Sequence, residues 1–574
     1  MAATEFASNA PGNARRRFYW TSSDLIAGAI LIAVAALVVI PLANLVRIAF
    51  SGESDVWPEL VAYVIPEALR QTVLLLAGVA ILTAIIGTGA AWLVTAYRFP
   101  GRDTLTWALA LPLAFPTYIV AYVYVDFFDA FGPMQSALFA LTGWRPNSAS
   151  WYPNIRSIGG AVFVFSLVLY PYVFLAARAM FQTQSASLFE VARTLGATRF
   201  MLARHVALPL ARPALAVGLS LALMETLNDI GASEYLGIRT LTLSIFTTWL
   251  NRSSLPGAAQ IACVMLIVIA GLIALERYGQ HDKRFHFATR RAQPLTPIVL
   301  TGRAAIAACI VCTLPVLFGF LLPAVHLANE TISRGLLGGF DPDLWRHTLH
   351  TVLFAAAATI AALVLGFGAV IAARMIRGNR SRSWTGTALT LAGLGYAVPG
   401  TVLALALMSP LVAIDEGLNA VSRALTGAGV GLIVAGSGTA IVIAYVVRFL
   451  AIATGSAQAG LSRVSTRVDD AARTLGQRPA ALARLIHIPL ARPALGGAAL
   501  LVFVDCLKEL PATLLLRPLN VETLSTYIYQ YAVRGNFEEG ALAALIIVAA
   551  GIVPVIRMAR YSDMALMPEA TPQD

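Results

Sequence analysis

Two segments of this chain, EVARTLGATRFMLARHVALPLARPAL at 190–215 and DAARTLGQRPAALARLIHIPLARPAL at 470–495, have closely similar sequences and lie 280 residues apart. Fifteen of the 26 aligned positions are identical, without a gap. Each copy is a basic, polar interruption of an apolar chain, and each ends in PLARPAL, where hydrophobicity resumes. A long-period repeat indicates duplicated architecture. The chain is therefore predicted to consist of two related halves that expose the same soluble segment on the same side of a membrane.

The composition is that of a membrane protein. Of the 574 residues, 58% are hydrophobic and 12% are charged, and the mean hydropathy is +0.74, whereas soluble domains are about 25% charged. Apolar runs of about 20 residues, enough to cross ~30 Å of hydrocarbon, recur along the chain. We predict twelve spans, at roughly 25–47, 70–96, 105–125, 158–181, 208–229, 257–275, 303–325, 348–373, 387–411, 430–451, 488–510 and 540–557.

Shorter matches extend the repeat through most of both halves. TVL at 72–74 and GTG at 87–89 match TVL at 351–353 and GFG at 366–368, and TLS at 242–244 matches TLS at 523–525. Six spans in each half is an even number, so both halves enter the membrane from the same side. The expected relation is a parallel repeat about an axis along the membrane normal, with a central pathway between the halves. The predicted fold class is an all-α polytopic membrane protein with two homologous six-helix halves.

The distribution of basic residues predicts the orientation. Arginines gather before the first span, after the second and eighth, in the repeated segments, between the halves and after the last span, whereas the alternate loops hold more acidic residues. Basic loops stay on the cytoplasmic side, so both termini are expected there. This alternation also argues that the net charge of +11 serves orientation in a lipid bilayer and not nucleic-acid binding. The predicted organisation is a cytoplasmic tail at 1–24, a first half at 25–278, a basic linker at 279–302, a second half at 303–558 and a cytoplasmic tail at 559–574.

Within each repeated segment, the order of residues predicts a helix, a turn and a second helix. An acidic residue, Glu190 or Asp470, leads; Ala-Arg-Thr-Leu follows after one residue, then Gly196 or Gly476. Glycine ends helices because it adopts the left-handed conformation at little cost. About a dozen residues further on, an apolar residue precedes Pro209 in the first copy and Pro489 in the second. The helical pair is expected to project from the cytoplasmic face.

This pattern resembles the EAA loop of ABC importer permeases, at 190–209 and at 470–489. The residues that carry the resemblance are Glu190, Ala192, Arg193, Gly196, Pro209, Asp470, Ala472, Arg473, Gly476 and Pro489. Val191 and Asp470 depart conservatively from the pattern. The resemblance implies that the short helix of each loop inserts into a separate ATPase subunit, so two ATPase copies are expected. The chain has no GxxxxGK[ST] motif for nucleotide, and we predict a transport subunit without enzymatic activity or cofactor.

Charged residues occur where the fifth and eleventh predicted spans end. Glu225 matches Asp505 and Asp229 matches Glu509 at an offset of 280, and Lys508 lies between the second pair. The i, i+4 spacing predicts that both carboxylates of a pair share one helical face. Such groups are costly in a membrane unless they face water, protein or a counter-charge. They are candidates for lining a pathway or gate, or for internal ion pairs that hold bent helices together; no resident metal site is predicted.

The same regions are similar to fused ferric-iron importer permeases. The similarity covers about 70–529 and includes ALMETLNDIGASEYLGI, VDCLKELPATLLLRP, LPLAFPTYIVAYVYVD and YPYVFLAARAMF. It implies a type I ABC importer permease of the bacterial inner membrane, with both halves on one polypeptide, supplied by a periplasmic substrate-binding protein. Fused thiamine permeases are built in a similar way. Thiamine, a polyamine or a phosphonate are therefore alternatives to ferric iron.

Two other classes of membrane protein are alternatives to this prediction. Twelve spans in two parallel halves also suit a secondary, ion-coupled transporter, and RFPGRD at 98–103 faintly echoes a motif of that architecture. The long repeated loops, however, are not a feature of such secondary transporters. A membrane enzyme is disfavoured because the sequence has neither HExxH nor GxSxG.

Overall fold

The structure is a computed structural model that describes residues 22–51, 56–129, 131–143, 153–183, 194–196, 198–281, 297–339, 341–376, 381–462, 464–477 and 479–564. The first half contains α1(Ser22–Ser51), α2(Trp57–Glu59), η1(Leu60–Val64), α3(Ile65–Ala96), β1(Tyr97–Arg98), α4(Arg102–Ala108), η2(Leu111–Ala114), α5(Thr117–Phe127), α6(Pro133–Thr142), α7(Ile158–Thr183), α9(Arg199–Leu202), η3(Ala203–Ala207), α10(Leu208–Asn228), α11(Ile230–Tyr235), α12(Leu241–Arg252) and α13(Leu255–His281).

The second half contains β2(Ile298–Val299), α14(Gly302–Val316), η4(Leu317–Leu321), α15(Leu322–Ser333), α16(Pro342–Met375), α17(Ser381–Gly393), η5(Leu394–Ala397), α18(Gly400–Thr426), α19(Gly438–Ser462), α20(Thr466–Thr474), α21(Pro479–Leu482), η6(Ala483–His487), α22(Ile488–Leu507), α23(Pro511–Leu516), α24(Leu524–Val533), η7(Phe537–Gly540) and α25(Ala541–Met564). The two strands pair in parallel, with Tyr97 opposite Ile298.

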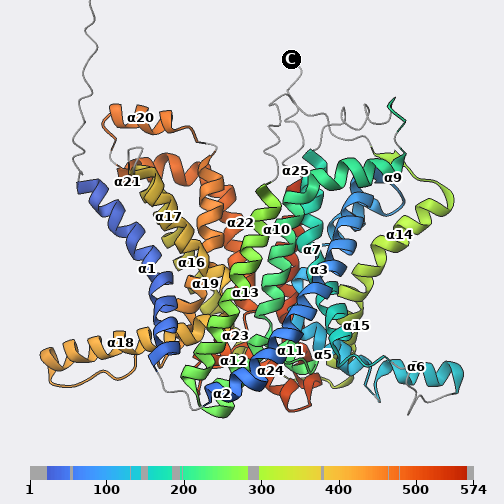
Figure 1. The fold of residues 1–574 in the computed structure, drawn as a ribbon, viewed down its shortest axis with the longest axis horizontal. Helices are drawn as coiled ribbons and strands as arrows, with labels where there is room; N and C mark the ends of the chain where they lie inside the picture. The colour runs from blue at the N-terminus through green and yellow to red at the C-terminus, as the bar shows by residue number, and fades with distance from the viewer. Residues whose placement is uncertain are drawn as a thin grey trace, which may run out of the picture.

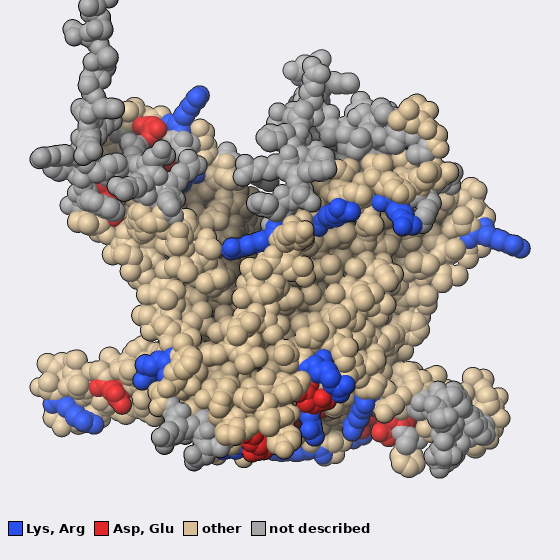
Figure 2. Space-filling view, in the orientation of Figure 1, with Lys and Arg blue, Asp and Glu red and all other residues tan. Residues whose placement is uncertain are grey.

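The helices form a bundle of membrane-spanning length. In the described residues, eleven helices are long and apolar enough to cross a membrane, and the bent pair 102–114 and 117–127 brings the total to twelve. This confirms the predicted polytopic all-α fold. On the face shown in Figure 2, a broad belt without charged side chains separates two charged rims. Such a belt is what contact with the hydrocarbon core of a bilayer requires, since charged side chains are costly there.

The two ends of the bundle carry different helices (Figure 1). The end that carries α9, α20 and α21 is called the repeat end below, because the repeated segments lie there. The other end carries α11, α12, α23 and α24 and is called the opposite end. Near the opposite end, α6 and α18 extend outward from opposite sides of the bundle.

Two predicted spans are not continuous helices. The third, expected at 105–125, bends by 90° between α4–η2 and α5. The ninth, expected at 387–411, is interrupted by η5, after which α18 runs to Thr426. The physical reason is a proline in each break, because proline excludes the helical conformation at the preceding residue. Phe115 before Pro116 has ψ 130°, and Val398 before Pro399 has ψ 124°.

Prolines also explain four wide turns. The π-helical turns η1, η3, η4 and η6 each end two residues before a proline, at Pro66, Pro209, Pro323 and Pro489. A proline inside a helix lacks an N–H group and clashes with the carbonyl four residues earlier. A π turn relieves this conflict without ending the helix. Pro209 and Pro489 therefore sit at equivalent widened turns where α10 and α22 begin.

The first helix of each half packs on the other half. α1 contacts α16, α17 and α18 as well as α13, whereas α14 and α15 contact α3, α4, α5 and α25. In Figure 1, α1 and α14 accordingly lie on the two outer flanks of the bundle. The outermost boundaries differ from expectation at both ends: α1 begins at Ser22, three residues before the predicted start at 25, and α25 continues to Met564, six residues past the predicted limit at 558. The two halves are thus interlocked through their first helices.

Candidate functional site

The repeated segments form the first candidate site. Gly196 and Gly476 have φ angles of +84° and +78°, which is the left-handed conformation predicted for a helix terminator. In the second copy, α20 ends at Thr474, two residues before Gly476. Glu190, Ala192 and Arg193 lie outside the described residues, as does the side chain of Arg473.

The described part of the second segment has an inner and an outer face. Asp469 and Ala472 of α20 are buried against the bundle, whereas Asp470 is exposed and Val468 is 40% exposed. Leu475, beside Gly476, is 79% exposed, and the equivalent Leu195 is 82% exposed. Scattered apolar residues at a protein surface are ordinary, but the same leucine is exposed at the same turn in both copies. The outer face therefore offers apolar side chains at the tip of each segment.

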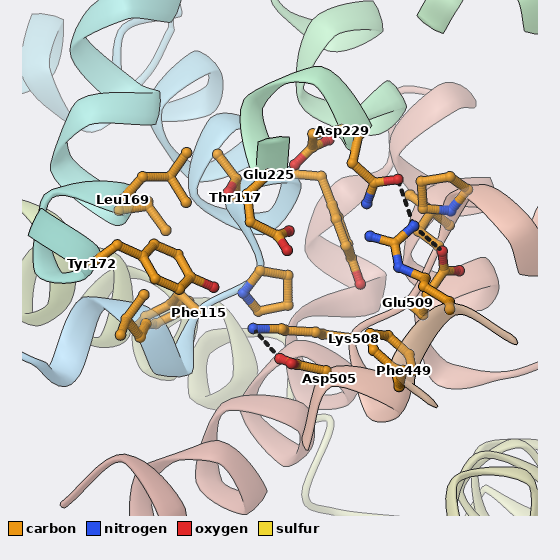
Figure 3. A pocket seen from close by; sticks show the side chains of 18 residues that line it. Phe115, Thr117, Leu169, Tyr172, Glu225, Asp229, Phe449, Asp505, Lys508 and Glu509 are labelled. Atoms are coloured by element: carbon orange, nitrogen blue, oxygen red, sulfur yellow. Dashed lines mark hydrogen bonds and ion pairs between the residues drawn. The ribbon is translucent and has the colours of Figure 1, made fainter. Parts of the chain in front are cut away.

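The second candidate site is a central cavity of about 50 Å³ near the ends of α10 and α22 (Figure 3). Its charged lining comprises Glu225, Asp229, Arg448, Asp505, Lys508 and Glu509. All five charged residues that the sequence predicts for this region thus lie together, and they join the two halves. Tyr172, Phe115 and Thr117 approach from the first half (Figure 3).

Arg448 links the two halves inside this layer. Its Nη1 donates to Asn228 Oδ1 at 2.7 Å and to Glu509 Oε1 at 3.3 Å. Asn228 Oδ1 also accepts from the backbone N–H of Gly400 at 2.8 Å. Arg448, Asn228 and Glu509 are all buried, and the exposed fraction of Arg448 is 4%. We call these residues the Arg448 network; in a low-dielectric interior such charged hydrogen bonds are strong.

Asp229 and Glu509 have structural contacts that the sequence did not predict. Asp229 is the N-cap of α11 and accepts from Ala232 N at 2.8 Å. Glu509 accepts from the backbone N–H groups of Ala512 and Thr513 at the start of α23. The helices do not extend as far as the i, i+4 spacing assumed, because α10 ends at Asn228 and α22 ends at Leu507, before the second carboxylate of each pair. All four carboxylates nevertheless line the same cavity. A carboxylate at a helix N-terminus satisfies free N–H groups.

The remaining charged groups face the cavity more directly. Lys508 Nζ and Asp505 Oδ1 form an ion pair at 2.9 Å, so Lys508 is the predicted counter-charge of that half. Glu225 Oε1 accepts from Tyr396 OH at 3.2 Å. Glu225, Asp505 and Lys508 are only partly buried.

A larger apolar cavity of about 440 Å³ adjoins the charged layer and shares Leu113, Tyr172, Asp505 and Lys508 with it. It is also lined by Leu221, Leu501 and Met558. Leu221 and Leu501 precede the charged residues in α10 and α22, which both run from the repeat end. The space therefore lies on the repeat-end side of the charged layer, and the layer closes it toward the opposite end.

Sequence reasoning missed Asn228, Tyr396 and Arg448. Arg448 carried a detectable signal, since it is an arginine inside the predicted span 430–451, and an ionisable residue there indicates a buried partner. Asn228 and Tyr396 carried none, because neutral polar side chains are ordinary in helices of this kind. Their contacts join different halves, and only the folded chain brings them together.

Two interlocked helical halves, a duplicated exposed segment at one end and a charged layer across a central cavity define a membrane transport permease. The family model described as "Binding-protein-dependent transport system inner membrane component" matches residues 83–285. The molybdenum transport system permease protein ModB of Escherichia coli is 30% identical over 186 residues, which are 31% of this chain and 77% of that protein. The chain belongs to this family of binding-protein-dependent inner-membrane permeases, which work in ABC importers.

Two relatives match almost the full length. The Fe(3+)-transport system permease protein FbpB 2 of Haemophilus influenzae is 23% identical over 504 residues, covering 86% of this chain and 90% of that protein. The probable ABC transporter permease protein y4fN of Sinorhizobium fredii is 27% identical over 587 aligned positions, covering 97% and 98%. In each of these two relatives, one polypeptide therefore matches both halves of this chain.

Proposed function

We propose that this permease imports a cationic substrate, with ferric iron as the first candidate, which a periplasmic binding protein delivers. The central cavity carries this proposal: its lining has four carboxyl groups, Glu225, Asp229, Asp505 and Glu509, against two cations, Arg448 and Lys508. With all six ionised, the net charge is −2 (two positive minus four negative). A cavity lined mainly by one sign of charge attracts ligands of the other sign. The full-length similarity to a permease named for Fe(3+) transport supports iron, and thiamine, also a cation, is the second candidate.

The proposed movement is alternating access between the two ends. The repeat end faces the cytoplasm, in agreement with the arginine pattern of the loops. The apolar cavity lies on the repeat-end side of the charged layer, and in this proposal the Arg448 network would close the layer toward the periplasm. ATP binding to two ATPase subunits, one at each repeated segment, would move α10 and α22 and separate Asn228 from Arg448. The binding protein would dock on the opposite end, which includes α11, α12, α23 and α24.

Uptake in a deletion strain tests the substrate. Cells that lack this chain are expected to lose uptake of radiolabelled ferric iron, and the restored wild-type chain should recover it. Glu225→Gln should lower uptake about tenfold, since one partly buried carboxylate is worth roughly 1–2 kcal/mol to a nearby cation. Glu67→Gln, at a partly exposed acidic residue outside the cavity, is the matched control and should retain uptake. Normal iron uptake in the deletion strain, with lost thiamine uptake, would replace iron by the second candidate.

Substitutions at the turn glycines test ATPase docking. Gly196→Val and Gly476→Val each place a β-branched side chain at a positive φ, which costs on the order of 1–2 kcal/mol and distorts the turn. Co-purification of the ATPase is expected to fall strongly in the double variant, while membrane insertion is unchanged. Glu190→Lys should act in the same direction. Gly271→Val, in the middle of α13 with open space around it, serves as the control. ATPase recovered in normal yield with the double variant would refute the assignment of these segments.

A further inference from the structure

A buried acidic side chain anchors the second repeated segment to the bundle. Asp469 lies in α20, next to the exposed Asp470, and its exposed fraction is only 5%. Asp469 Oδ2 accepts from Arg374 Nε at 2.6 Å, and Asp469 Oδ1 accepts from His487 Nε2 at 2.9 Å. Arg374 belongs to the last turn of α16, and His487 is the last residue of η6 before α22. One carboxylate therefore joins three separate helical elements.

Arg374 extends this connection to a fourth helix. Its Nη1 donates to the carbonyl oxygen of Leu461 at 2.8 Å, and its Nη2 donates to that of Val464 at 2.6 Å. Leu461 lies in the last turn of α19, where carbonyl groups lack intrahelical partners and a cation is favourable. Arg374, Asp469 and His487, called the Asp469 clamp below, thus connect the ends of α16 and α19 with α20 and the start of α22.

The clamp is a charged structure in a buried place. Burial tends to raise the pKa of Asp469, but the hydrogen bonds from Arg374 and His487 outweigh burial and hold that pKa below its ordinary value. The carboxylate is therefore ionised near neutral pH. Its contribution to stability is present above the unfolded pKa and is lost only as the pH falls through the lower folded value. Removal of one partner would leave a buried group without compensation.

The three residues of the clamp are not repeated at the matching positions of the first half. At offsets of 279 and 280, Thr95 replaces Arg374, Phe189 replaces Asp469 and Ala207 replaces His487. None of these residues can carry a charge. Within the described part of the chain, the buried Oγ1 of Thr95 has no hydrogen-bond partner, and Phe189 lies outside that part. The two repeated segments are similar in sequence, but at these matched positions only the second half has residues that can form the ionic contacts.

We infer that Asp469 is a positioning residue that transmits ATPase movement from α20 into α16, α19 and α22, and that the two halves are coupled to their ATPases unequally. The inference rests on the proposed docking of ATPase subunits at these segments. The outer face of the second repeated segment, with Val468, Asp470 and Leu475, would contact the ATPase. The inner face of this segment, through Asp469, holds α16, α19 and α22 so that these three helices move with α20 as one unit. The first segment lacks this anchor and would transmit less of the movement.

The test uses the complete transporter, with its ATPase and binding protein, in proteoliposomes. Asp469→Asn removes the charge at nearly constant volume, whereas Asp470→Asn changes the exposed neighbour. For Asp469→Asn, we expect ATPase affinity close to that of the wild type and about tenfold less substrate moved per ATP hydrolysed, within the usual range of coupling effects. For Asp470→Asn, the affinity for the ATPase should fall instead. Thr95→Val, at the position equivalent to Arg374, should leave both quantities unchanged.

A second pair of variants covers the case in which Asp469→Asn does not accumulate. His487→Gln keeps an N–H donor near Asp469 and should retain the wild-type ratio of substrate moved to ATP hydrolysed. His487→Leu removes the donor and should lower this ratio. Equal ratios for the two His487 variants, or a wild-type ratio in Asp469→Asn, would overturn the inference. A parallel loss of ATPase affinity in Asp469→Asn would assign the residue to docking and overturn it as well. A wild-type chain that bound no ATPase would instead refute the proposed function.

Discussion

Replacement of Arg448 by Met is expected to lower the free energy of unfolding by about 3–5 kcal/mol, the usual cost of removing one partner from a buried ion pair. Arg448 donates to Asn228 at 2.7 Å and to Glu509 at 3.3 Å, and both partners are buried. Without the guanidinium group, Glu509 keeps its backbone donors but loses the one cationic contact that it makes within the described residues. The closed layer should open more readily, so ATP hydrolysis without binding protein should also rise. Chemical denaturation in nanodiscs and basal hydrolysis measure the two effects.

The double variant Arg448→Met, Glu509→Gln tests the physical reason. Gln retains an oxygen acceptor for the N–H groups of α23 but carries no charge, so the double variant should be more stable than Arg448→Met alone. Arg346→Met is the control, because its ion pair with Asp343 is largely exposed and such pairs contribute about 0–1 kcal/mol. A loss below about 1 kcal/mol in Arg448→Met would show that the network does not hold the halves together.

The second large effect is expected at equivalent helix crossings. Gly87→Ala and Gly366→Ala should each destabilise the protein by about 1–3 kcal/mol, since overpacking moves backbone atoms. A Cβ at Gly87 would lie 2.8 Å from the carbonyl oxygen of Tyr170 in α7. A Cβ at Gly366 would lie 2.8 Å from Ala453 Cβ and 3.0 Å from Thr454 N in α19. The sites lie in different halves, so the two losses should add to about 2–6 kcal/mol in the double variant.

The chain supplies matched controls two residues further along. At Gly89 and Gly368, a Cβ would meet no other described atom within 4 Å. Gly89→Ala and Gly368→Ala should therefore be neutral or slightly stabilising, since alanine has a higher helix propensity than glycine. Denaturant midpoints of the four single variants measure the contrast. Equal midpoints for the crossing and control positions would show that the helices do not pack this closely.

Several elements of the fold could be predicted from local sequence. Spans of 20 or more apolar residues identify helices because each buried backbone group in lipid needs an internal partner. The turns at Gly196 and Gly476 followed from the conformational freedom of glycine, and the structure has both at positive φ. Pro116 and Pro399 lie in or near predicted spans, where a proline usually marks a kink, and the structure has a complete break in the helix at each. A proline can kink a helix or end it, and the packing around it decides which.

The candidate sites could be predicted only in part. The sequence placed Glu225, Asp229, Asp505, Lys508 and Glu509 at the ends of equivalent spans, and the structure brings them to one cavity. The sequence did not show that Asp229 and Glu509 cap the next helix whereas Glu225 lies within α10. That difference depends on where α10 and α22 end. Asp469 was passed over in favour of its neighbour Asp470, since a helix rotates adjacent residues by about 100° and only burial shows which one faces inward.

By itself, the sequence determined that this protein spans a membrane, that it has two related halves and that each half exposes one repeated segment. These properties follow from hydrophobicity, periodicity and duplication, which act over short stretches or between matching stretches. Only the tertiary structure decided that α1 and α14 pack on the opposite halves, that Arg448 joins Asn228 to Glu509, and that Asp469 joins the second segment to Arg374 and His487. Those features depend on contacts between residues far apart in sequence, and their energies arise only when folding removes the groups from water.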